Sequence, residues 1–257
     1  MDETIRGVIF DIDGVLEYQG TVFPGAIESV QTLRQKGLAL RFLTNSTLKN
    51  RQTCAIKLNR KGFQIDPAEV FTASYIAAVY LRGLNPRSCW VMLEAEGLEE
   101  FIDIPQDEED PEYLVVGDNR SRFDFQTLNK ALRCLRRGSK LVGLISELVD
   151  SSLGELELNV GSWVGMLERA SGVAAVYTGK PAVLAFELAL KSMGLDARQV
   201  LMVGDRVSSD IQGAQACGMK AALLRTGEFQ PGDLEGAVQP DYLFDSISEI
   251  LQLFPAV

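Results

Sequence analysis

The sequence predicts an α/β protein with a parallel sheet and a second α/β domain inserted into the first. Short apolar runs rich in β-formers alternate with helical patterns at both ends of the chain, and a middle segment of about a hundred residues has its own alternation. With 257 residues, the chain is long enough for two domains of moderate size. We expect a core domain from residues 1–76 and 177–257, and an inserted domain over residues 77–176.

The amino-terminal part of the core predicts three strands with two helices between them. The expected strands are 5–10, 38–43 and 70–72, and the expected helices are 26–36 and 49–61. Because strands joined through helices form right-handed crossovers, these strands are expected to be parallel.

Strands and helices are also expected to alternate in the carboxyl-terminal part of the core and in the inserted segment. Expected elements of the core are a helix over 181–193 with Pro181 in its first turn, a helix over 211–217, strands 200–203, 220–224 and 242–244, and a closing helix. In the inserted domain we expect strands 89–93, 113–116 and 141–145, helices 125–137 and 162–170, and a solvated acidic loop over 106–112.

Composition excludes several classes of function. A net charge of −10 argues against nucleic-acid or anionic-membrane partners, and no apolar run approaches the roughly 20 residues of a membrane span. The chain has no histidine, so an imidazole base is ruled out. The four cysteines form no C-x-x-C pair and Met1-Asp2-Glu3-Thr4 does not resemble a signal peptide, so a cytoplasmic location is expected.

Four short motifs carry the chemistry, and each follows or lies close to an expected strand. They are Asp11-Ile12-Asp13-Gly14, Thr44-Asn45, Gly179-Lys180-Pro181, and Gly204-Asp205 with Asp210. The carboxyl ends of parallel strands converge on one crevice, so these residues are expected to meet there. Together they supply a carboxylate nucleophile, a second acid, a hydroxyl, an ammonium group and a carboxylate pair able to hold a metal, which favours phosphoryl transfer.

Each motif alone has an ordinary interpretation. Asp-x-Asp-Gly occurs in turns and resembles part of a calcium loop, although the preceding strand argues against an EF-hand. Thr44 alone would be a capping hydroxyl, Lys180 a surface lysine, and Asp205 with Asp210 the start of a helix. The coincidence of all four at strand ends or helix starts favours the functional interpretation.

With these motifs in this order, the chain resembles the haloacid dehalogenase-like (HAD) superfamily, and within it the subfamily IIA phosphatases, over nearly its whole length. Asp11 to Leu16 resembles the first motif of that family, Leu43-Thr44-Asn45-Ser46 the second, Gly179-Lys180-Pro181 the third, and Gly204-Asp205-Arg206 with Ser209-Asp210 the fourth. The resemblance implies a Rossmann-like core with a large α/β cap inserted between the second and third motifs.

The resemblance also implies a role for each site residue. Asp11 would be the nucleophile that forms an aspartyl-phosphate, and Asp13 the general acid and base. Phosphate would be bound by Thr44, Asn45, Ser46 and Lys180. Mg²⁺ would be held by Asp11, Asp205, Asp210 and the backbone carbonyl of Asp13. The expected function is a Mg²⁺-dependent phosphatase of small phosphorylated metabolites.

The expected cap departs from its family in the loop that reads the leaving group. Related chains tend to carry Asn-Pro-Asp or basic residues there, whereas this one has Ser146-Glu147-Leu148. Either the preference has moved away from strongly anionic leaving groups, or the activity is weak and the protein is a HAD-fold binding or scaffold protein. The helix before this loop carries several basic residues, and their spacing is more typical of a solvated face than of a substrate site. They are Arg133, Arg136, Arg137 and Lys140.

Two further alternatives concern the class of protein and its assembly. A receiver-type signalling module also combines acids, Thr, Lys and Mg²⁺. In receivers the acids come before both Thr and Lys, whereas here an acid pair follows the Lys. A receiver also needs only about half the length of this chain. Related proteins often dimerise through the cap, which leaves a homodimer open. The natural substrate is not identified by the sequence.

Overall fold

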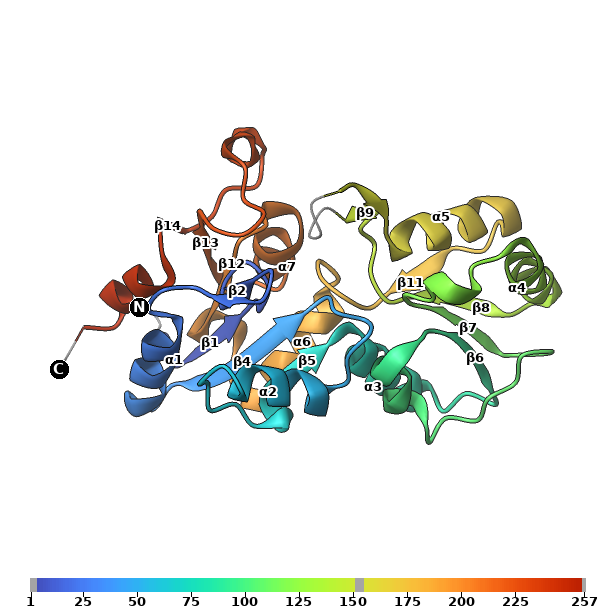
Figure 1. The fold of residues 1–257 in the computed structure, drawn as a ribbon, viewed down its shortest axis with the longest axis horizontal. Coiled ribbons are helices and arrows are strands. Elements are labelled where there is room, and N and C mark those ends of the chain that lie inside the picture. The colour runs from blue at the N-terminus through green and yellow to red at the C-terminus, as the bar shows by residue number, and fades with distance from the viewer. Residues whose placement is uncertain (1–3, 151–154, 256–257) are drawn as a thin grey trace. The chain divides into compact units, whose positions relative to one another are not determined.

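The computed structural model describes residues 4–150 and 155–255 and divides the chain into two compact units (Figure 1). The first unit comprises Met1–Thr44, Cys54–Phe71 and Lys180–Val257, and the second comprises Asn45–Thr53 and Thr72–Gly179. Relative to the expected inserted domain over 77–176, the second unit also includes 45–53, 72–76 and 177–179. The helix α3 (Ala73–Leu84), which the sequence patterns did not predict, lies across the first expected boundary. Helix α3 packs against the 3₁₀ helix η2 (Ala95–Phe101) of the second unit, and this packing accounts for the difference.

The sheet of the first unit has six strands in the order β14-β13-β12-β1-β4-β5. Its strands are β1 (Gly7–Phe10), β4 (Ala39–Thr44), β5 (Val70–Thr72), β12 (Val200–Gly204), β13 (Lys220–Leu224) and β14 (Tyr242–Phe244). β1 pairs in parallel with both β4 and β12, and the pairs β12–β13 and β13–β14 are also parallel. The expected parallel sheet is confirmed.

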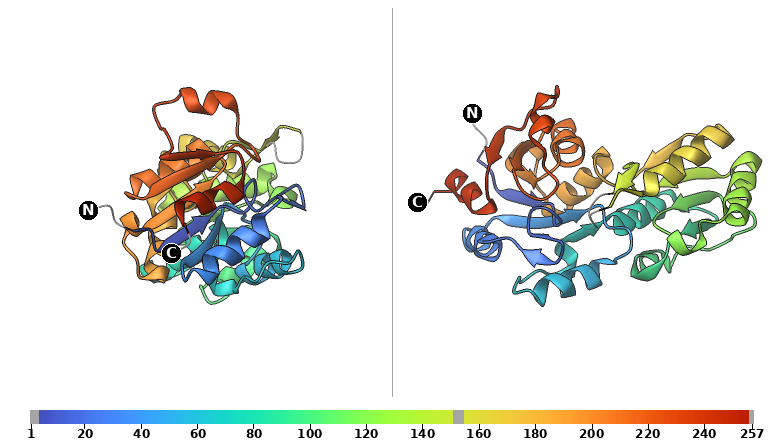
Figure 2. Two further views of the ribbon diagram at one scale, coloured as in Figure 1. Left: turned by 90° about the vertical axis from the view of Figure 1, so that its left-hand side faces the viewer. Right: turned by 45° about the horizontal axis from the view of Figure 1, so that its top comes forward.

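Helices cover both faces of this sheet, which explains why β1 is apolar at every position and does not alternate. Phe42 of β4 packs in a core with residues of α1 (Ala26–Gln35) and α2 (Arg51–Asn59). The adjacent Arg41 donates from Nε to Ser192 Oγ at 2.7 Å, on α6 (Val183–Met193). Because successive strand residues point to opposite faces, α6 lies on the other side of the sheet from α1 and α2, as Figure 2 also shows.

The second unit has its own parallel sheet in the order β11-β8-β7-β6. The strands are β6 (Cys89–Met92), β7 (Tyr113–Val116), β8 (Lys140–Gly143) and β11 (Ala175–Tyr177), and the helices α4 (Phe125–Arg137) and α5 (Val160–Ser171) pack against each other and on this sheet. A small antiparallel hairpin, β9 (Val149–Asp150) with β10 (Glu157–Leu158), precedes α5.

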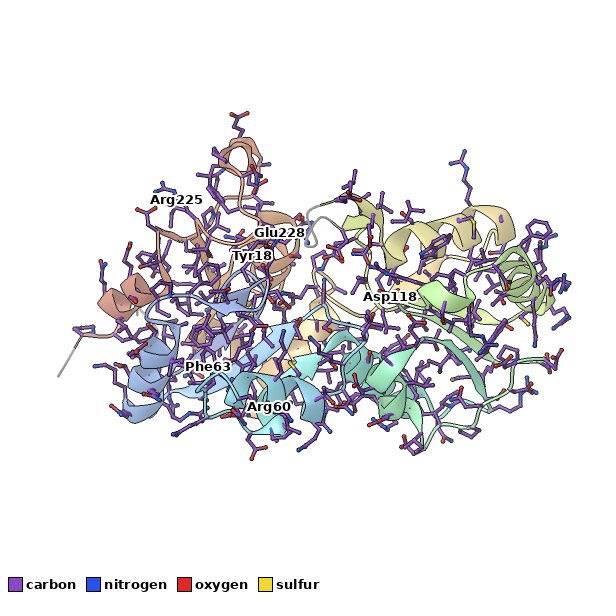
Figure 3. The ribbon with its side chains drawn as sticks, viewed as in Figure 1. Tyr18, Arg60, Phe63, Asp118, Arg225 and Glu228 are labelled. Carbon is purple, nitrogen blue, oxygen red and sulfur yellow. The ribbon has the colours of Figure 1, made fainter. Side chains whose placement is uncertain are left out.

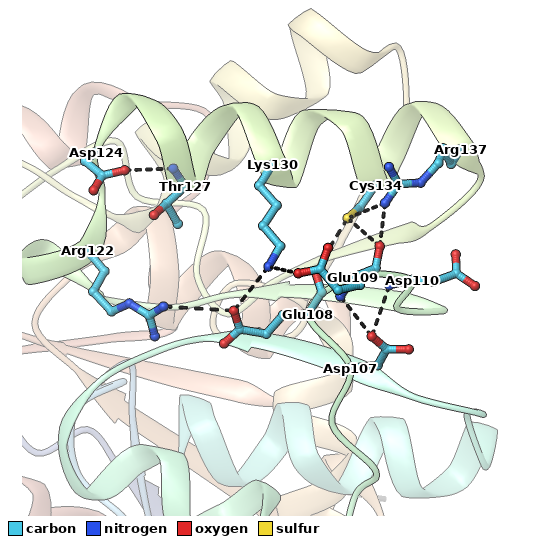
Figure 4. A network of polar contacts seen from close by, with 10 residues as sticks. All are labelled: Asp107, Glu108, Glu109, Asp110, Arg122, Asp124, Thr127, Lys130, Cys134 and Arg137. Carbon is cyan, nitrogen blue, oxygen red and sulfur yellow. Dashed lines mark hydrogen bonds and ion pairs between the residues drawn. The ribbon is translucent and has the colours of Figure 1, made fainter.

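The acidic loop expected to be solvated is largely exposed, and it also contacts helix α4 (Figure 4). Lys130 Nζ lies 2.7 Å from Glu109 Oε1, and Arg137 donates to the Glu109 carbonyl. Arg136 donates to the carbonyl of Ser171 at 3.3 Å, and Lys140 pairs with Glu112 at 3.3 Å. These contacts give three of the four basic side chains singled out in the sequence a partner within the second unit.

One local expectation near the motifs was wrong. Helix α6 begins at Val183, and the cis Lys180–Pro181 bond lies in the turn before it, so Pro181 is not in the first helical turn. The helix expected over 211–217 is confirmed as α7 (Gln212–Ala216); a π-helical turn that the sequence patterns did not predict, η5 (Val207–Ile211), precedes it.

The remaining elements are short. They are the hairpin β2 (Glu17–Tyr18) with β3 (Thr21–Val22), and the 3₁₀ helices η1 (Pro67–Glu69), η3 (Arg120–Arg122), η4 (Ala197–Gln199), η6 (Pro231–Glu235) and η7 (Ile247–Leu253). Within residues 4–150 and 155–255, none of the helices combines the length and the apolar character needed to cross a bilayer.

Candidate active site

Asp11 is held at the carboxyl end of the central strand β1. Its backbone N–H donates to the carbonyl of Val203 on β12 at 2.9 Å, which continues the sheet by one residue. Its carboxylate Oδ1 accepts from the N–H of Ile12 at 2.7 Å, and the residue is only 6% exposed. The carboxylate is therefore oriented by its own backbone.

Lys180 joins two of the acids. Its Nζ lies 2.8 Å from Asp11 Oδ1 and 2.7 Å from Asp210 Oδ1, and its side chain is 2% exposed. Burying an ammonium group is costly unless carboxylates compensate it. This lysine is a member of the acid cluster, and the surface-lysine interpretation is excluded.

Asp205 follows β12 and sits between two glycines. A Cβ built on Gly14 would lie 2.0 Å from Asp205 Oδ2, and one on Gly227 would lie 2.2 Å from the same atom. Both glycines have positive φ, +88° and +58°, so the close approach and the backbone conformation both require glycine. Asp205 Oδ2 also accepts from the N–H of Glu228 at 2.8 Å.

Asp210 lies in the π-helical turn η5 and is fully buried. Its Oδ2 accepts from the N–H of Arg206 at 3.1 Å, and its other oxygen faces Lys180. Single π-helical turns are often found at functional sites, because they reposition a side chain that a regular helix would direct elsewhere.

Burial dominates the electrostatics of this cluster. It raises the pKa of Asp205 to about 7, with the charge of Asp210 adding to the effect. Burial also raises the pKa of Asp11 well above its ordinary range, against the opposing effect of Lys180. Although burial opposes it, the carboxylates of Asp11 and Asp210 raise the pKa of Lys180. The cluster thus contains the three carboxylates of Asp11, Asp205 and Asp210 and one ammonium group, that of Lys180. A divalent cation would neutralise the excess negative charge.

The donor set fits such a cation. One carboxylate oxygen from each of Asp11, Asp205 and Asp210 can be chosen so that all three lie within 4.8 Å of one another. Within the described part of the chain, Asp205 Oδ1 is buried and has no hydrogen-bond partner. Unsatisfied buried carboxylate oxygen is unusual, and three hard oxygen donors suit Mg²⁺.

The other predicted site residues are placed less directly. Thr44 is 3% exposed at the end of β4, and β4 pairs with β1 so that Phe42 lies opposite Phe10, which brings Thr44 to the same sheet edge as Asp11. Asp13 is exposed on the turn that follows β1. Asn45 and Ser46 belong to the second unit, where Asn45 Nδ2 donates to Glu147 Oε1 at 2.7 Å.

The loop after β13 was missed by the sequence analysis. In addition to the contacts of Gly227 and Glu228 with Asp205, Thr226 donates from Oγ1 to the carbonyl of Gly14 at 2.5 Å. Glu228 pairs with Arg206 at 3.1 Å and is labelled in Figure 3. The available signal was Thr226-Gly227 close after the predicted strand 220–224, a placement similar to that of the other motifs.

Comparisons with known proteins show the family to which the chain belongs. Residues 8–104 match the family described as haloacid dehalogenase-like hydrolase, and residues 177–250 match a HAD-hydrolase-like family. The phospholysine phosphohistidine inorganic pyrophosphate phosphatase of Rattus norvegicus is 36% identical, over 97% of this chain and 94% of its own length.

Solved structures give the same result. The p-nitrophenyl phosphatase from Archaeoglobus fulgidus superposes with a TM-score of 0.91 at 27% identity, covering 97% of this chain and 99% of that one. For the 4-nitrophenylphosphatase of Thermotoga maritima the TM-score is 0.90 at 26% identity, covering 96% and 97%. The chain belongs to the haloacid dehalogenase-like hydrolases and, within them, to the subfamily IIA phosphatases.

Proposed function

We propose that this protein is a Mg²⁺-dependent phosphatase of small phosphorylated metabolites that acts through an aspartyl-phosphate on Asp11. The observation that carries the proposal is the Asp11 carboxylate, oriented at the end of β1 and paired with the buried Lys180 within a cluster of acids. In this proposal the first unit is the catalytic core and the second, including residues 77–176, is the cap. A cytoplasmic location is part of the same proposal.

Asp11 is the nucleophile in the first step. One of its carboxylate oxygens attacks phosphorus, the phosphorus–oxygen bond to the leaving group breaks, and Asp13 donates its proton to the departing oxygen. The contact of Lys180 with Asp11 at 2.8 Å lowers the repulsion between a carboxylate and an anionic phosphoryl group. Thr44, Asn45 and Ser46 bind the phosphoryl oxygens, with Thr44 already at the edge of the sheet beside Asp11.

Bound Mg²⁺ would be held by Asp11, Asp205, Asp210 and the Asp13 carbonyl, and it supplies positive charge for the phosphoryl oxygens. The buried, unpartnered Oδ1 of Asp205 supports this ligand set. Asp210 also keeps Lys180 in place through its 2.7 Å contact.

The second step clears the intermediate. Asp13, now ionised, accepts a proton from a water molecule whose oxygen attacks phosphorus, and the bond between phosphorus and the Asp11 oxygen breaks. Inorganic phosphate leaves, and Asp13 is again protonated. One acid thus serves both steps, which requires its carboxyl group to stay within reach of the leaving oxygen and then of water.

Substrate choice is assigned to the cap. The relative from Rattus norvegicus is named for phospholysine, phosphohistidine and pyrophosphate, and the solved structures are named for p-nitrophenyl phosphate, so a small phosphorylated compound is supported. The hydrogen bond from Asn45 to Glu147 ties the expected leaving-group loop to the residue after Thr44. This acidic side chain fits a preference shifted away from strongly anionic leaving groups.

Turnover of p-nitrophenyl phosphate with Mg²⁺ tests the proposal, followed by a panel of phosphorylated sugars, nucleotides, pyridoxal phosphate, phosphoglycolate and pyrophosphate. We expect turnover that is lost on chelation and absent in Asp11→Asn. The control is Asp245→Asn, an exposed acid of the same unit whose partner is Arg225, which should keep wild-type activity. An active Asp11→Asn protein would refute the covalent route, and no turnover across the whole panel would favour the scaffold alternative.

A further inference from the structure

A buried ion cluster that the proposed mechanism does not use lies at the β2–β3 hairpin. Glu17 of β2 has a side chain only 1% exposed, and its two carboxylate oxygens contact Lys57 and Lys61 separately. Lys57 belongs to α2 and Lys61 follows the end of that helix, with side chains 36% and 21% exposed. Figure 3 labels the neighbours Tyr18, which follows Glu17, and Arg60, which precedes Lys61.

The backbone of Glu17 forms hydrogen bonds with the residues on both sides of Asp13. Its N–H donates to the carbonyl of Ile12 at 3.2 Å, and its carbonyl accepts from the N–H of Gly14 at 2.7 Å. Asp13 therefore lies between the two residues that Glu17 binds, and it forms an isolated β-bridge with Glu17 itself. Any shift of Glu17 moves the peptide units on both sides of Asp13.

The side chain of Glu17 links this turn to helix α2. Lys61 donates to the carbonyl of Gly20 at 2.8 Å as well as to Glu17, so the first strand of the hairpin and its turn are both attached to the end of α2. Although burial opposes it, the hydrogen bonds from Lys57 and Lys61 hold the pKa of Glu17 below its ordinary value. The carboxylate remains charged within this cluster.

Stability alone does not explain a charged side chain at this position. A buried ion cluster commonly gains little over a well-packed apolar side chain of similar volume, because desolvation offsets the attraction. The two residues before Glu17, Val15 and Leu16, are fully buried apolar residues, so this turn accommodates apolar side chains. An ion cluster differs from an apolar contact in its directionality: each lysine restricts where the carboxylate can lie.

We propose that Glu17, clamped by Lys57 and Lys61, is a positioning residue that holds the Asp13 turn so that the carboxyl group of Asp13 can protonate the leaving oxygen. The inference rests on the proposed function and adds a role that the motifs do not include. Its consequence is specific: loosening the clamp harms proton donation more than nucleophilic attack by Asp11, whose backbone is bound to β12.

The leaving group provides a readout that separates positioning from general structure. p-Nitrophenolate departs with little need of a proton, whereas phenolate from phenyl phosphate needs one. General acid catalysis contributes about 10²- to 10⁴-fold, so partial misplacement of Asp13 in Glu17→Gln should lower kcat/KM for phenyl phosphate by about tenfold or more. We expect kcat/KM for p-nitrophenyl phosphate to fall less than about threefold, because kcat/KM contains only the steps up to departure of the leaving group and this leaving group needs little protonation. The ester ratio is therefore taken from kcat/KM, since hydrolysis of the aspartyl-phosphate, in which Asp13 also acts, is common to both esters.

Glu69→Gln is the matched control. Glu69 pairs with Arg34 at 2.6 Å in the same unit, is also largely buried, and has no backbone bond to the Asp13 turn. This variant should affect both esters equally. Lys61→Met is the second test variant, since it removes the contacts to Glu17 and Gly20 and leaves Lys57 to compensate the charge; it should change the ester ratio in the same direction.

An equal fall for the two esters in Glu17→Gln would overturn the positioning role, and so would an unchanged ester ratio in Lys61→Met. Thermal unfolding of each variant is measured in parallel, and failure of both to fold would show that the cluster is purely structural. Wild-type protein and Asp11→Asn are assayed alongside. Inactive wild type or active Asp11→Asn contradicts the proposed function, whereas the ester ratio tests the clamp alone.

Discussion

Replacing Asp205 with asparagine should stabilise the metal-free protein while abolishing its response to Mg²⁺. The carboxylate of Asp205 is 1% exposed and lies in a cluster with Asp11 and Asp210, where ionisation is unfavourable. Asparagine keeps the size of the side chain and an oxygen able to accept from the N–H of Glu228, but it carries no charge. The substitution therefore removes an unfavourable ionisation that the proposed metal site requires.

The magnitude follows from the pKa of Asp205, which rises from 3.8 to about 7 on folding. At about 1.36 kcal/mol per pKa unit, this pKa difference lowers the folding stability by about 4 kcal/mol at pH 8 and by about 1.7 kcal/mol at pH 5. A raised carboxyl pKa means that stability is lost as the pH rises from about 4 through 7. The gain from Asp205→Asn should accordingly be larger at pH 8 than at pH 5, by up to about 2.6 kcal/mol.

Thermal unfolding in EDTA at the two pH values measures this difference. A change of 1 kcal/mol moves the unfolding midpoint by roughly 2–4 °C in a protein of about this size, so the midpoint at pH 8 should rise by up to about 8–16 °C. Added Mg²⁺ should raise the midpoint of the wild type and leave that of Asp205→Asn unchanged. A lower midpoint for the variant at pH 8, or equal gains at pH 5 and pH 8, would refute the reasoning.

Three other predictions concern the same site. Lys180→Met in EDTA should lower the unfolding free energy by up to about 3–5 kcal/mol in urea denaturation, because Asp11 and Asp210 lose the ammonium group between them. Mg²⁺ binding to the wild type, measured by calorimetry, should weaken about tenfold from pH 8 to pH 6, because a proton occupies Asp205 below a pKa of about 7. Gly14→Ala should destabilise the protein and weaken Mg²⁺ binding, because its Cβ would lie 2.0 Å from Asp205 Oδ2 and its φ is +88°; thermal unfolding and calorimetry measure both effects.

Each of these has its own control or contrary outcome. Gly20→Ala matches Gly14→Ala, because Gly20 has φ +86° and a Cβ added there would meet no heavy atom within 4 Å, so it tests backbone strain without the contact. Equal losses in the two alanine variants would show that the contact with Asp205 is unimportant. A stable Lys180→Met protein in EDTA, or Mg²⁺ affinity independent of pH between 6 and 8, would contradict the electrostatic account.

Local patterns were sufficient for the strands at which the motifs end. Apolar runs such as 200–203 and 220–224 are short, rich in β-formers and followed by Gly-Asp or a turn, and both became strands of the parallel sheet. Helix α4 was predicted with its observed bounds, and in the structure Asp124 caps it and Gly138 ends it. The helix Ala73–Leu84 was not predicted; its sequence is more apolar overall than that of the predicted helix α1.

The order of the motifs, the residue types of the site and the α/β class could all be predicted from the chain alone, because they depend on local propensity and on the rule that parallel strand ends converge. Tertiary packing was needed to place Lys180 between Asp11 and Asp210, to enclose Asp205 between Gly14 and Gly227, and to clamp Glu17 with two lysines. Burial and charge pairing of this kind arise between residues that are far apart in the chain. No local pattern encodes the distance between the Asp11 carboxylate and the Lys180 ammonium group, yet that distance helps to set the pKa values and the chemistry of the site.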